Sequence, residues 1–408
     1  MADIALIAAL DTKGLEAGFL AAEIARRGHR PIVIDVGVLG RPAIGADVAR
    51  EVVAAAGGAV LADLVTAGDR GAAVARMAAG AASVLADRFR SAGLDAVIGL
   101  GGGAGTSIAA RAMRELPLGV PKVLVSTLAG GDVSGFVGES DIVMLPSIVD
   151  IAGLNRISRE VFSRAAAVVS AMAETTRQAG DERPLLAATM FGNTTPCVEA
   201  ARAALERAGY EVLVFHATGT GGRTMEHLIR SRYIAGVLDV TTTEWADELV
   251  GGVMAAGPHR LEAAARAGVP AVVAPGCLDM VNFWAPDTVP PSFVGRRFYQ
   301  HAPNVTLMRT TPNENARLGR VLASRLNLST GPVAVFLPLR GVSLISVEEG
   351  PFYWPEADEA LFGAIRTHLR PDIELHALDC AINDPAFASA MATRLLEMVA
   401  DAGGGATR

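Results

Sequence analysis

Cysteine, aromatic side chains and long apolar segments are scarce in this sequence. The chain has 3 cysteines and 5% aromatic residues. The cysteines form neither a CxxC pair nor a spacing typical of zinc ligands, and no HxH or HExxH motif is present. These absences argue against a disulfide framework and a structural metal, and they favour a reducing, cytoplasmic environment.

No apolar segment approaches the roughly 20 residues that cross a membrane. The longest ones, 142–145 and 148–154, are bounded or interrupted by Asp141, Pro146 and Asp150. The sequence also starts almost directly with an apolar segment, without the pattern of a cleavable signal. We therefore expect no membrane partner.

Positive charge is not concentrated anywhere along the chain. The formal net charge is −7 at pH 7, with 36 Lys and Arg against 43 Asp and Glu. Because sequence-independent binding to nucleic acids usually needs a cationic face, we expect no nucleic-acid partner. The composition leaves a homo-oligomer open.

What the chain does contain is a long internal repeat. When 181 is added to the residue numbers of the first half, Asp35 falls on His216 and Gly40 on Gly221, with no gap. Each copy reads as strand, polar turn, amphipathic helix, strand and glycine-rich loop, which is typical of nucleotide-sized clefts. The alternative is a chance alignment of two unrelated units of a common supersecondary type.

Strands and helices alternate along both halves, and a second echo links Gly119–Thr127 to Gly268–Gly276. A chain of 408 residues is expected to form two to three domains. The pattern predicts an α/β fold of two doubly wound, Rossmann-like domains with mainly parallel sheets, related by internal duplication. The charged segment Gly180–Pro184 predicts a boundary between a nucleotide-binding domain (1–180) and a second domain (181–408) with a long loop, 278–311.

Glycine, serine and threonine follow several predicted strands, where open parallel sheets bind their ligands. The strongest candidate is Gly101–Ser107, which lies between a β-branched strand and a helix. Its glycines would let backbone N–H groups turn toward a phosphate, and Thr106 and Ser107 would add hydroxyl donors. The alternative is a tight turn that binds nothing. The loop is neither a Walker A motif nor a GxGxxG fingerprint.

Other polar residues near strand ends in the first half are candidates for the same cofactor. Lys13 could reach a phosphate or remain solvated, and Asp11 could hold magnesium through water or cap a helix. Asp132 is a similar candidate, with a turn-forming role as the alternative. The cofactor-binding candidates in this half are Asp11, Thr12, Lys13, Gly102, Gly103, Gly105, Thr106, Ser107, Ser126, Thr127, Gly130, Asp132, Asn155 and Arg156.

The second half offers a comparable set of loops. Arg223 follows a Gly/Thr loop and could clamp a carboxylate or phosphate, unless it is an ordinary surface arginine. Asp279, Asn282 and Arg309 are candidates to cap the site only because they lie in the long loop. The cofactor-binding candidates in this half are Thr194, Thr195, Gly219, Gly221, Gly222 and Arg223.

The sequence assigns no catalytic residue. His216 ends a strand and is either a general base or a half-buried histidine. Cys197 lies at a helix N-terminus, which lowers a thiol pKa, but a buried small hydrophobic residue is the alternative. Glu244 follows three threonines and is a candidate base.

Several segments carry a resemblance to a known family. They are Leu10–Gly14, Asp35–Gly40, Gly101–Ser107, Asp150–Arg156, Met190–Cys197, His216–Arg223, Leu278–Phe283, Met308–Thr311 and Leu337–Ser343. With them the chain resembles the Tm-1-like ATP-binding domain family, which includes bacterial proteins and the N-terminal part of a plant protein that restricts tobamoviruses. The resemblance implies two α/β subdomains, ATP binding and a magnesium ion. The family's Gly-Gly-Ser-Gly-Gly-Thr reads Gly101-Gly-Gly-Ala-Gly-Thr106 here, which removes a hydroxyl and stiffens one backbone position.

We therefore expect a cytosolic protein with ATP and Mg²⁺ as cofactors. It would either only bind ATP or use it on a small acidic metabolite in a cleft between the domains. The alternatives are a nucleotide-independent hydrolase or lyase acting on a phosphorylated or carboxylated metabolite, and a non-catalytic, two-lobed ligand sensor. A nicotinamide oxidoreductase ranks last because the first strand–helix turn lacks the expected glycines.

Overall fold

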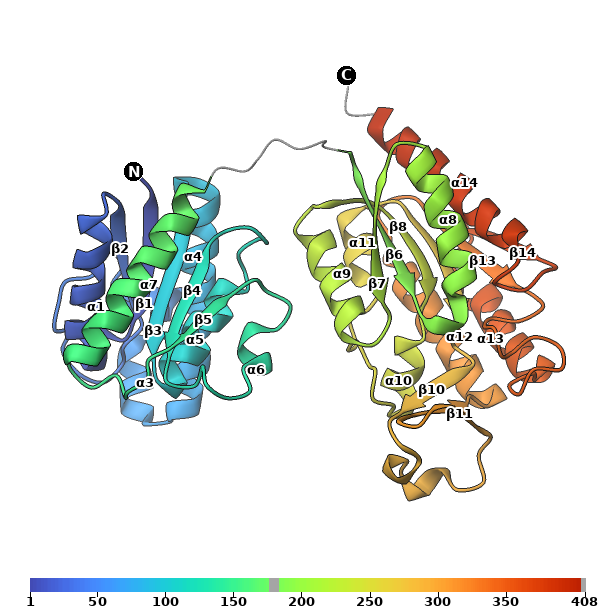
Figure 1. The fold of residues 1–408 in the computed structure, drawn as a ribbon, viewed down its shortest axis with the longest axis horizontal. Helices are drawn as coiled ribbons and strands as arrows, with labels where there is room; N and C mark the ends of the chain where they lie inside the picture. Colours follow the sequence, from blue (N-terminus) through green and yellow to red (C-terminus); the bar gives the residue numbers. More distant parts are fainter. Residues whose placement is uncertain (176–182, 405–408) are drawn as a thin grey trace. The chain divides into compact units, whose positions relative to one another are not determined.

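The computed structural model describes residues 1–175 and 183–404. Contacts divide the chain into two units, Met1–Ala179 and Gly180–Arg408, and both are α/β, as predicted (Figure 1). Most of the expected boundary segment, at 180–182, lies outside the described residues. Among the helices that are described, none combines the length and the apolar character needed to cross a membrane.

A five-stranded parallel sheet forms the centre of the N-terminal unit, in the order β2-β1-β3-β4-β5. The chain first winds from β1 to β2 and then reverses to β3, so the sheet has a switch point between β1 and β3, where doubly wound sheets bind ligands. The strands are β1 (Asp3–Ala8), β2 (Arg30–Asp35), β3 (Ala96–Gly101), β4 (Lys122–Ser126) and β5 (Val143–Pro146).

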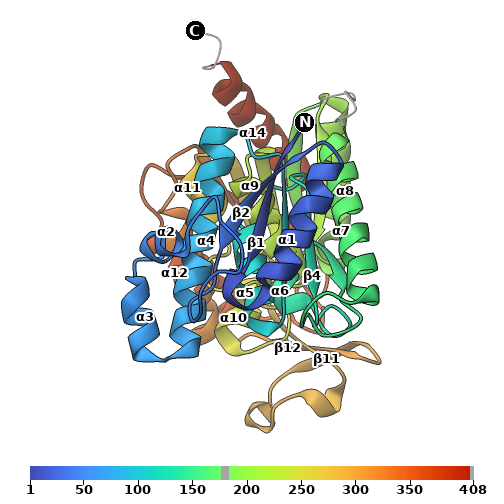
Figure 2. The ribbon, with the colours of Figure 1, turned by 90° about the vertical axis from the view of Figure 1, so that its left-hand side faces the viewer.

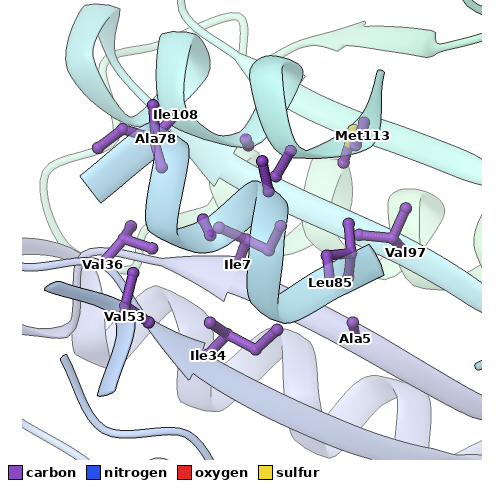
Figure 3. Packing of buried hydrophobic residues seen from close by; sticks show 14 of the residues in the cluster. Ala5, Ile7, Ile34, Val36, Val53, Ala78, Leu85, Val97, Ile108 and Met113 are labelled. Atoms are coloured by element: carbon purple, nitrogen blue, oxygen red, sulfur yellow. The ribbon is translucent and has the colours of Figure 1, made fainter. Parts of the chain in front are cut away.

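Helices cover both faces of this sheet (Figures 1 and 2). On one face α1 and α7 pack side by side over Leu6 and Ile98, and on the other α2, α4 and α5 enclose Ile7, Ile34 and Val97 (Figure 3). Both sets of strand side chains are buried, which explains the continuous apolar runs in the sequence. The helices are α1 (Leu10–Arg26), α2 (Arg50–Ala56), α3 (Leu61–Ala67), α4 (Arg70–Ala92), α5 (Gly103–Met113), α6 (Ser134–Val137) and α7 (Arg156–Glu174).

The C-terminal unit is built on a six-stranded parallel sheet, in the order β7-β6-β8-β9-β13-β14. Its strands are β6 (Leu185–Met190), β7 (Glu211–His216), β8 (Ile234–Thr241), β9 (Ala271–Gly276), β13 (Val333–Pro338) and β14 (Glu374–Leu378). Its helices are α8 (Thr195–Arg207), α9 (Thr220–Arg230), α10 (Glu244–Val250), α11 (Glu262–Ala267), α12 (Pro312–Leu326), α13 (Pro355–His368) and α14 (Pro385–Gly404), with 3-10 turns η1 (Gly192–Thr194), η2 (Pro286–Thr288) and η3 (Pro291–Phe293).

The two sheets confirm the predicted duplication. The first five strands of each unit, counted along its main sheet, have the same spatial order and direction. β2 starts at Arg30 and β7 at Glu211, which is the 181-residue offset found in the sequence. The second echo also joins equivalent strands, because β4 and β9 are both fourth in their sheets.

Residues 278–311 differ from the expected long loop. They contain a small antiparallel sheet, β10-β12-β11, formed by β10 (Met280–Phe283), β11 (Phe298–Ala302) and β12 (Val305–Arg309). Strands of four or five residues are too short to show a clear alternation. All four residues of β10 are buried, so the two-residue period is lost in that strand.

The local helix signals succeed in one case and fail in another. Asp69 caps α4 by accepting a hydrogen bond from the Ala72 amide, as aspartate before a helix commonly does. Asp47 also precedes a helix, but its carboxylate accepts from the Val33 amide of β2, and α2 begins only at Arg50. A β-strand amide at hydrogen-bonding distance therefore replaces the cap.

Close packing of α2 against α4 depends on Gly80. A Cβ atom on Gly80 would lie 1.8 Å from the Val53 carbonyl oxygen of α2. We predict that Gly80→Ala destabilises this unit by about 1–3 kcal/mol through overpacking. Hydrogen exchange measured by mass spectrometry should then be at least several-fold faster in α2 and α4.

Gly71→Ala is the matched control in the same helix. Its Cβ would have only the Asp69 carboxylate nearby, at 3.4 Å, so exchange should be unchanged or slower because alanine favours helices. Equal exchange rates in the Gly80→Ala protein and the wild type would contradict the packing argument.

Candidate functional site

A pocket of about 400 Å³ lies beyond the carboxyl ends of β1, β2 and β3, at the switch point of the N-terminal sheet. Three segments that follow these strands form one side, and α3 and α4 form the other. The lining residues are Ala9, Asp11, Thr12, Val36, Gly37, Val38, Leu39, Leu64, Gly68, Asp69, Arg70, Ala73, Val74, Met77, Ala104, Gly105 and Ile108.

The start of α5 borders this pocket. The helix begins at Gly103 behind Gly102, and the amides of Gly103, Ala104 and Gly105 have no side-chain or loop partner among the described residues. The first amides of a helix have no partner within the helix, and they lie at the positive end of its dipole. This edge of the pocket therefore presents free N–H donors.

Glycines in this loop serve two different purposes. A Cβ on Gly101 would lie 2.7 Å from the Gly105 Cα, so Gly101 is required for tight packing of the strand against the helix. A Cβ on Gly103 would meet nothing within 4 Å, and this residue has no positive φ. No packing contact requires a glycine at position 103, and the missing side chain leaves the backbone accessible to the close approach of a ligand.

The opposite walls of the pocket are apolar. They are formed by Leu64 of α3, Val74 and Met77 of α4, Val38 after β2 and Ile108 of α5. The pocket thus combines polar donors at one edge with a hydrophobic interior, which is usual for sites that bind small organic ligands.

Asp11 lies at this pocket but is already engaged. Its Oδ2 accepts from the amides of Val38 (3.1 Å), Leu39 (2.9 Å) and Gly40 (3.2 Å), with Arg50 behind it at 3.7 Å. The loop after β2 is thus an anion-binding turn whose anion is an internal carboxylate. Asp11 is not a helix N-cap, its Oδ2 atom is not free to bind a metal, and it belongs to no group of three His, Cys, Asp or Glu side chains within the described residues that could hold one.

The remaining predicted residues of the first half have several different positions. Asp11, Thr12 and Gly105 line the pocket, and Gly102 and Gly103 begin the adjacent helix. Thr106 and Ser126 form a buried hydroxyl pair at 2.7 Å, and the Ser107 hydroxyl bonds the Gly103 carbonyl.

The Lys13 ammonium is bound to the Ile151 carbonyl, and Asn155 caps α7, whose first residue is the exposed Arg156. Thr127, Gly130 and Asp132 are exposed after β4. Hydrogen bonding to the Ser134 side chain, and then to the Ser134 amide, lowers the pKa of the Asp132 carboxyl, in line with the turn-forming alternative.

The corresponding loop of the C-terminal unit is also occupied by a carboxylate. Glu244 Oε1 accepts from the amides of Gly219 (2.8 Å) and Gly222 (3.1 Å). Under the 181-residue offset, Gly219 corresponds to Val38, whose amide is bound by Asp11. The same loop thus receives an internal anion in both units, and Glu244 is not a free general base.

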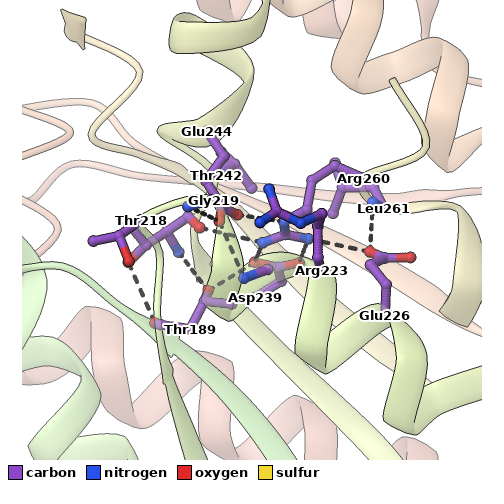
Figure 4. Close-up of polar contacts among 12 residues, drawn as sticks. Thr189, Thr218, Gly219, Arg223, Glu226, Asp239, Thr242, Glu244, Arg260 and Leu261 are labelled. Atoms are coloured by element: carbon purple, nitrogen blue, oxygen red, sulfur yellow. Dashed lines mark hydrogen bonds and ion pairs between the residues drawn. The ribbon is translucent and has the colours of Figure 1, made fainter. Parts of the chain in front are cut away.

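Behind Glu244 lies a fully buried arginine (Figure 4). Arg260 makes two hydrogen bonds to Asp239, at 2.6 and 2.7 Å, and one to Glu244 at 2.7 Å, and Glu226 is 3.4 Å away. Burial alone would lower the pKa of Arg260, but the three carboxylates raise it well above its ordinary value. Burial raises the pKa of Glu226, although Arg260 opposes this.

Other predicted residues of the second half serve the interior of that unit. The buried Thr194 hydroxyl lies 2.8 Å from that of Thr241, and the Thr195 hydroxyl bonds the Phe191 carbonyl. A Cβ on Gly221 would lie 1.9 Å from the His216 carbonyl oxygen, so Gly221 is a packing residue. The exposed Arg223 donates to the Ala255 carbonyl.

The residues expected to cap the site are buried instead. Asp279, Asn282 and Arg309 are fully enclosed in the C-terminal unit. Asn282 bonds Asp247, and Arg309 bonds Asp358. The position of these residues in the sequence was a poor guide because 278–311 folds into a sheet with a buried face.

The candidate catalytic residues are not assembled for catalysis. Burial, aided by the charge of Cys380, raises the pKa of the Cys197 thiol to about 12, so the helix N-terminus does not activate it. His216 is exposed and stacks on Phe191. Within residues 1–175 and 183–404, no group of three His, Cys, Asp or Glu side chains could hold a metal ion.

The sequence did not identify the apolar half of the pocket. Val74 and Met77 recur at a three-residue spacing on α4; Met77 is itself fully buried in the core, and Val74 packs against that core. Such a stripe is indistinguishable from a core-facing stripe until the helix is placed against the sheet.

Comparisons with known proteins place these features in a wider context. Residues 2–178 match the N-terminal domain, and residues 183–399 the C-terminal domain, of the uncharacterised protein family UPF0261. A UPF0261 protein of Clostridium tetani is 48% identical over 97% of this chain and 98% of its own length. The ToMV resistance protein Tm-1 of Solanum lycopersicum is 42% identical over 81% of this chain but only 45% of its own length. The crystal structure of Acinetobacter baumannii MurG covers 98% of this chain and 100% of its own, with 12% identity and a TM-score of 0.23.

Loss of the buried arginine should strongly destabilise the C-terminal unit. We predict that Arg260→Ala lowers its free energy of unfolding by about 3–5 kcal/mol, because it leaves Asp239 and Glu244 buried without a counter-charge. All three tryptophans (Trp245, Trp284 and Trp354) lie in this unit, so urea titration followed by tryptophan fluorescence reports on it directly.

Arg266→Ala is the control. Arg266 is 64% exposed and pairs with Glu262 on the surface of α11, so its loss should change the unfolding free energy by under about 1 kcal/mol. Similar midpoints for the two variants would show that the buried network is not essential.

The three thiols should differ sharply in reactivity. In the folded protein at pH 8, iodoacetamide should label Cys380 first, because Cys197 and Cys277 are buried and their thiol pKa values are strongly raised. A pKa near 12 leaves about a thousandfold less thiolate than a pKa of 9. Mass spectrometry should find all three cysteines labelled in urea. If Cys197 is labelled as fast as Cys380 in the folded protein, the predicted difference in thiol reactivity is wrong.

Proposed function

The chain belongs to the uncharacterised protein family UPF0261, and we propose that its N-terminal unit binds ATP in the pocket beyond β1, β2 and β3. One observation carries this proposal: free amides at the start of α5 adjoin a pocket whose opposite walls are apolar. A nucleotide has the same division, with an anionic polyphosphate at one end and an apolar, aromatic base at the other.

The phosphates would lie at the start of α5. Backbone amides at a helix N-terminus, together with the helix dipole, stabilise phosphate groups. Thr12 and Arg70 also line the pocket and supply a hydroxyl and a positive charge. The loop after β2 is a less suitable position, because Asp11 already accepts from its amides and would repel a phosphate.

The base would lie between α4 and the segment after β2. Val38, Leu64, Val74 and Met77 provide an apolar surface there. The volume of about 400 Å³ is within the range of about 300–1,000 Å³ that is common for small-molecule sites.

Magnesium does not fit as an ion held by the protein at Asp11. Mg²⁺ needs carboxylate oxygens that are free to coordinate, directly or through water. Asp11 Oδ2 accepts three amide hydrogen bonds, and Asp69 caps α4. We therefore assign no role to a protein-held metal in this pocket.

The proposal is one of binding rather than of catalysis at this pocket. The titratable residues that line it, within the described part of the chain, are Asp11, Asp69 and Arg70. Both acids are engaged in hydrogen bonds to backbone amides, so neither is a free general base. Use of ATP on a small acidic metabolite stays a prediction of the sequence.

Ala104→Asp separates binding from folding. Ala104 is the second residue of α5 and lines the pocket. A carboxylate there should stabilise the helix through its dipole but repel the phosphates. By isothermal titration calorimetry, we expect at least a tenfold weaker affinity for ATP, about 1.4 kcal/mol.

Ala104→Asn is the neutral control, and its affinity should stay within about threefold of the wild type. Adenosine, which lacks phosphates, should be insensitive to the charge at position 104. ATP at about 100 times its dissociation constant should stabilise the unit by about 2.7 kcal/mol. The proposal fails if wild-type protein gives neither heat nor thermal stabilisation at millimolar ATP, or if all three proteins bind ATP equally.

A further inference from the structure

A second cavity, of about 630 Å³, lies in the C-terminal unit beyond the carboxyl ends of β13 and β14. The first half of α13 forms one wall, and the loops that follow the two strands form the rest. The lining residues are Leu339, Arg340, Gly341, Ser346, Val347, Glu348, Tyr353, Pro355, Asp358, Glu359, Phe362, Arg366, Ala381 and Asp384. The proposed ATP pocket uses none of these residues, so this cavity is a separate candidate site.

The two arginines on the cavity wall are already paired. Arg340 forms two hydrogen bonds to Asp379, both 2.7 Å long. Arg366 pairs with Glu359 at 2.8 Å. Neither guanidinium is therefore free to attract an anionic ligand to this cavity.

The carboxylates on the wall are less satisfied. Asp358 is 7% exposed, and its Oδ1 accepts from Arg309 at 2.6 Å, while Oδ2 has no partner within the described residues. Asp384 Oδ2 accepts from the Ala381 amide at 2.7 Å, and its Oδ1 is likewise unpaired in the described part of the chain. Glu348 is exposed, and no residue among those described bonds its carboxylate.

The balance of charge is negative. Arg309 neutralises Asp358, and the two wall arginines are neutralised by Asp379 and Glu359. Glu348 and Asp384 have no ion-pair partner among the described residues, and Arg340, the cation whose pKa both acids help to raise, is already paired with Asp379. Charge complementarity therefore favours a cationic ligand over a phosphate or a carboxylate.

We propose that this cavity binds a small organic amine, with an ammonium group near Glu348 and Asp384. The unpaired Oδ2 of Asp358 offers a further acceptor, and Tyr353 and Phe362 provide aromatic contact for an aliphatic body or a cation. A divalent metal ion is a poorer occupant, because these carboxylates do not form a metal-binding group within the described residues. The volume is also far larger than one ion requires.

A matched series of five-carbon probes tests the charge preference. Isothermal titration calorimetry of the full chain should detect 1,5-diaminopentane and should detect neither 1,5-pentanediol nor glutarate at the same millimolar concentrations. Binding of glutarate with equal or higher affinity, or no heat from the diamine, overturns the proposal.

Two substitutions locate the binding to the cavity. Glu348→Gln should weaken diamine affinity about fivefold, which is the upper end of the effect of an exposed ion pair. Glu348 lies at the surface, so the substitution should not affect folding. Glu356→Gln removes the same charge from the exposed first turn of α13, outside the cavity, and should change affinity less than about twofold. If both variants weaken binding equally, the diamine is attracted by general surface charge and does not bind in the proposed cavity.

Asp358→Asn tests the unpaired Oδ2 of Asp358. Asparagine keeps an oxygen for Arg309 but donates an N–H where the amine would donate, so diamine binding should fall further than in Glu348→Gln. Tryptophan fluorescence in urea checks that this variant is folded. If it does not fold, the comparison of Glu348→Gln with Glu356→Gln still decides the proposal.

Discussion

An internal carboxylate bound to the amides of the loop after the second strand is the interaction on which both units depend. Asp11 fills this position in the N-terminal unit and Glu244 in the C-terminal unit. A buried arginine lies behind each carboxylate, Arg50 in one case and Arg260 in the other. The carboxylate and the arginine are buried in both units, and a buried charge without its partner is costly, so the loop amides, the acid and the arginine stabilise one another.

This interaction also decides where a ligand can bind. In each unit the loop after the second strand is saturated by protein groups, although its glycines resemble a phosphate loop in the sequence. The start of α5 differs, because its first amides have no side-chain acceptor among the described residues and a pocket adjoins them. Two halves with the same strand order thus offer different chemistry at their carboxyl edges, and the difference arises from where the acidic side chains lie.

The sequence predicted the architecture better than the site. Hydrophobic runs and the 181-residue offset predicted two α/β units with mainly parallel sheets, because buried parallel strands leave a strong local signal, but the order of the strands came only from the structure. Asp11, Lys13 and Glu244 were assigned to ligand or catalytic roles, but the backbone groups that bind them lie 22 to 138 positions away. Local sequence contains no information on such distant contacts. The apolar pocket wall was missed for the same reason, since Val74 and Met77 resemble core residues.

The two internal carboxylates, Asp11 and Glu244, come from different positions of the duplicated unit. Asp11 corresponds to Gly192 under the 181-residue offset, and Gly192 has no side chain; Glu244 is instead the first residue of α10, which follows β8. The halves therefore do not share an inherited acid at this loop, although they share the loop and its demand for negative charge.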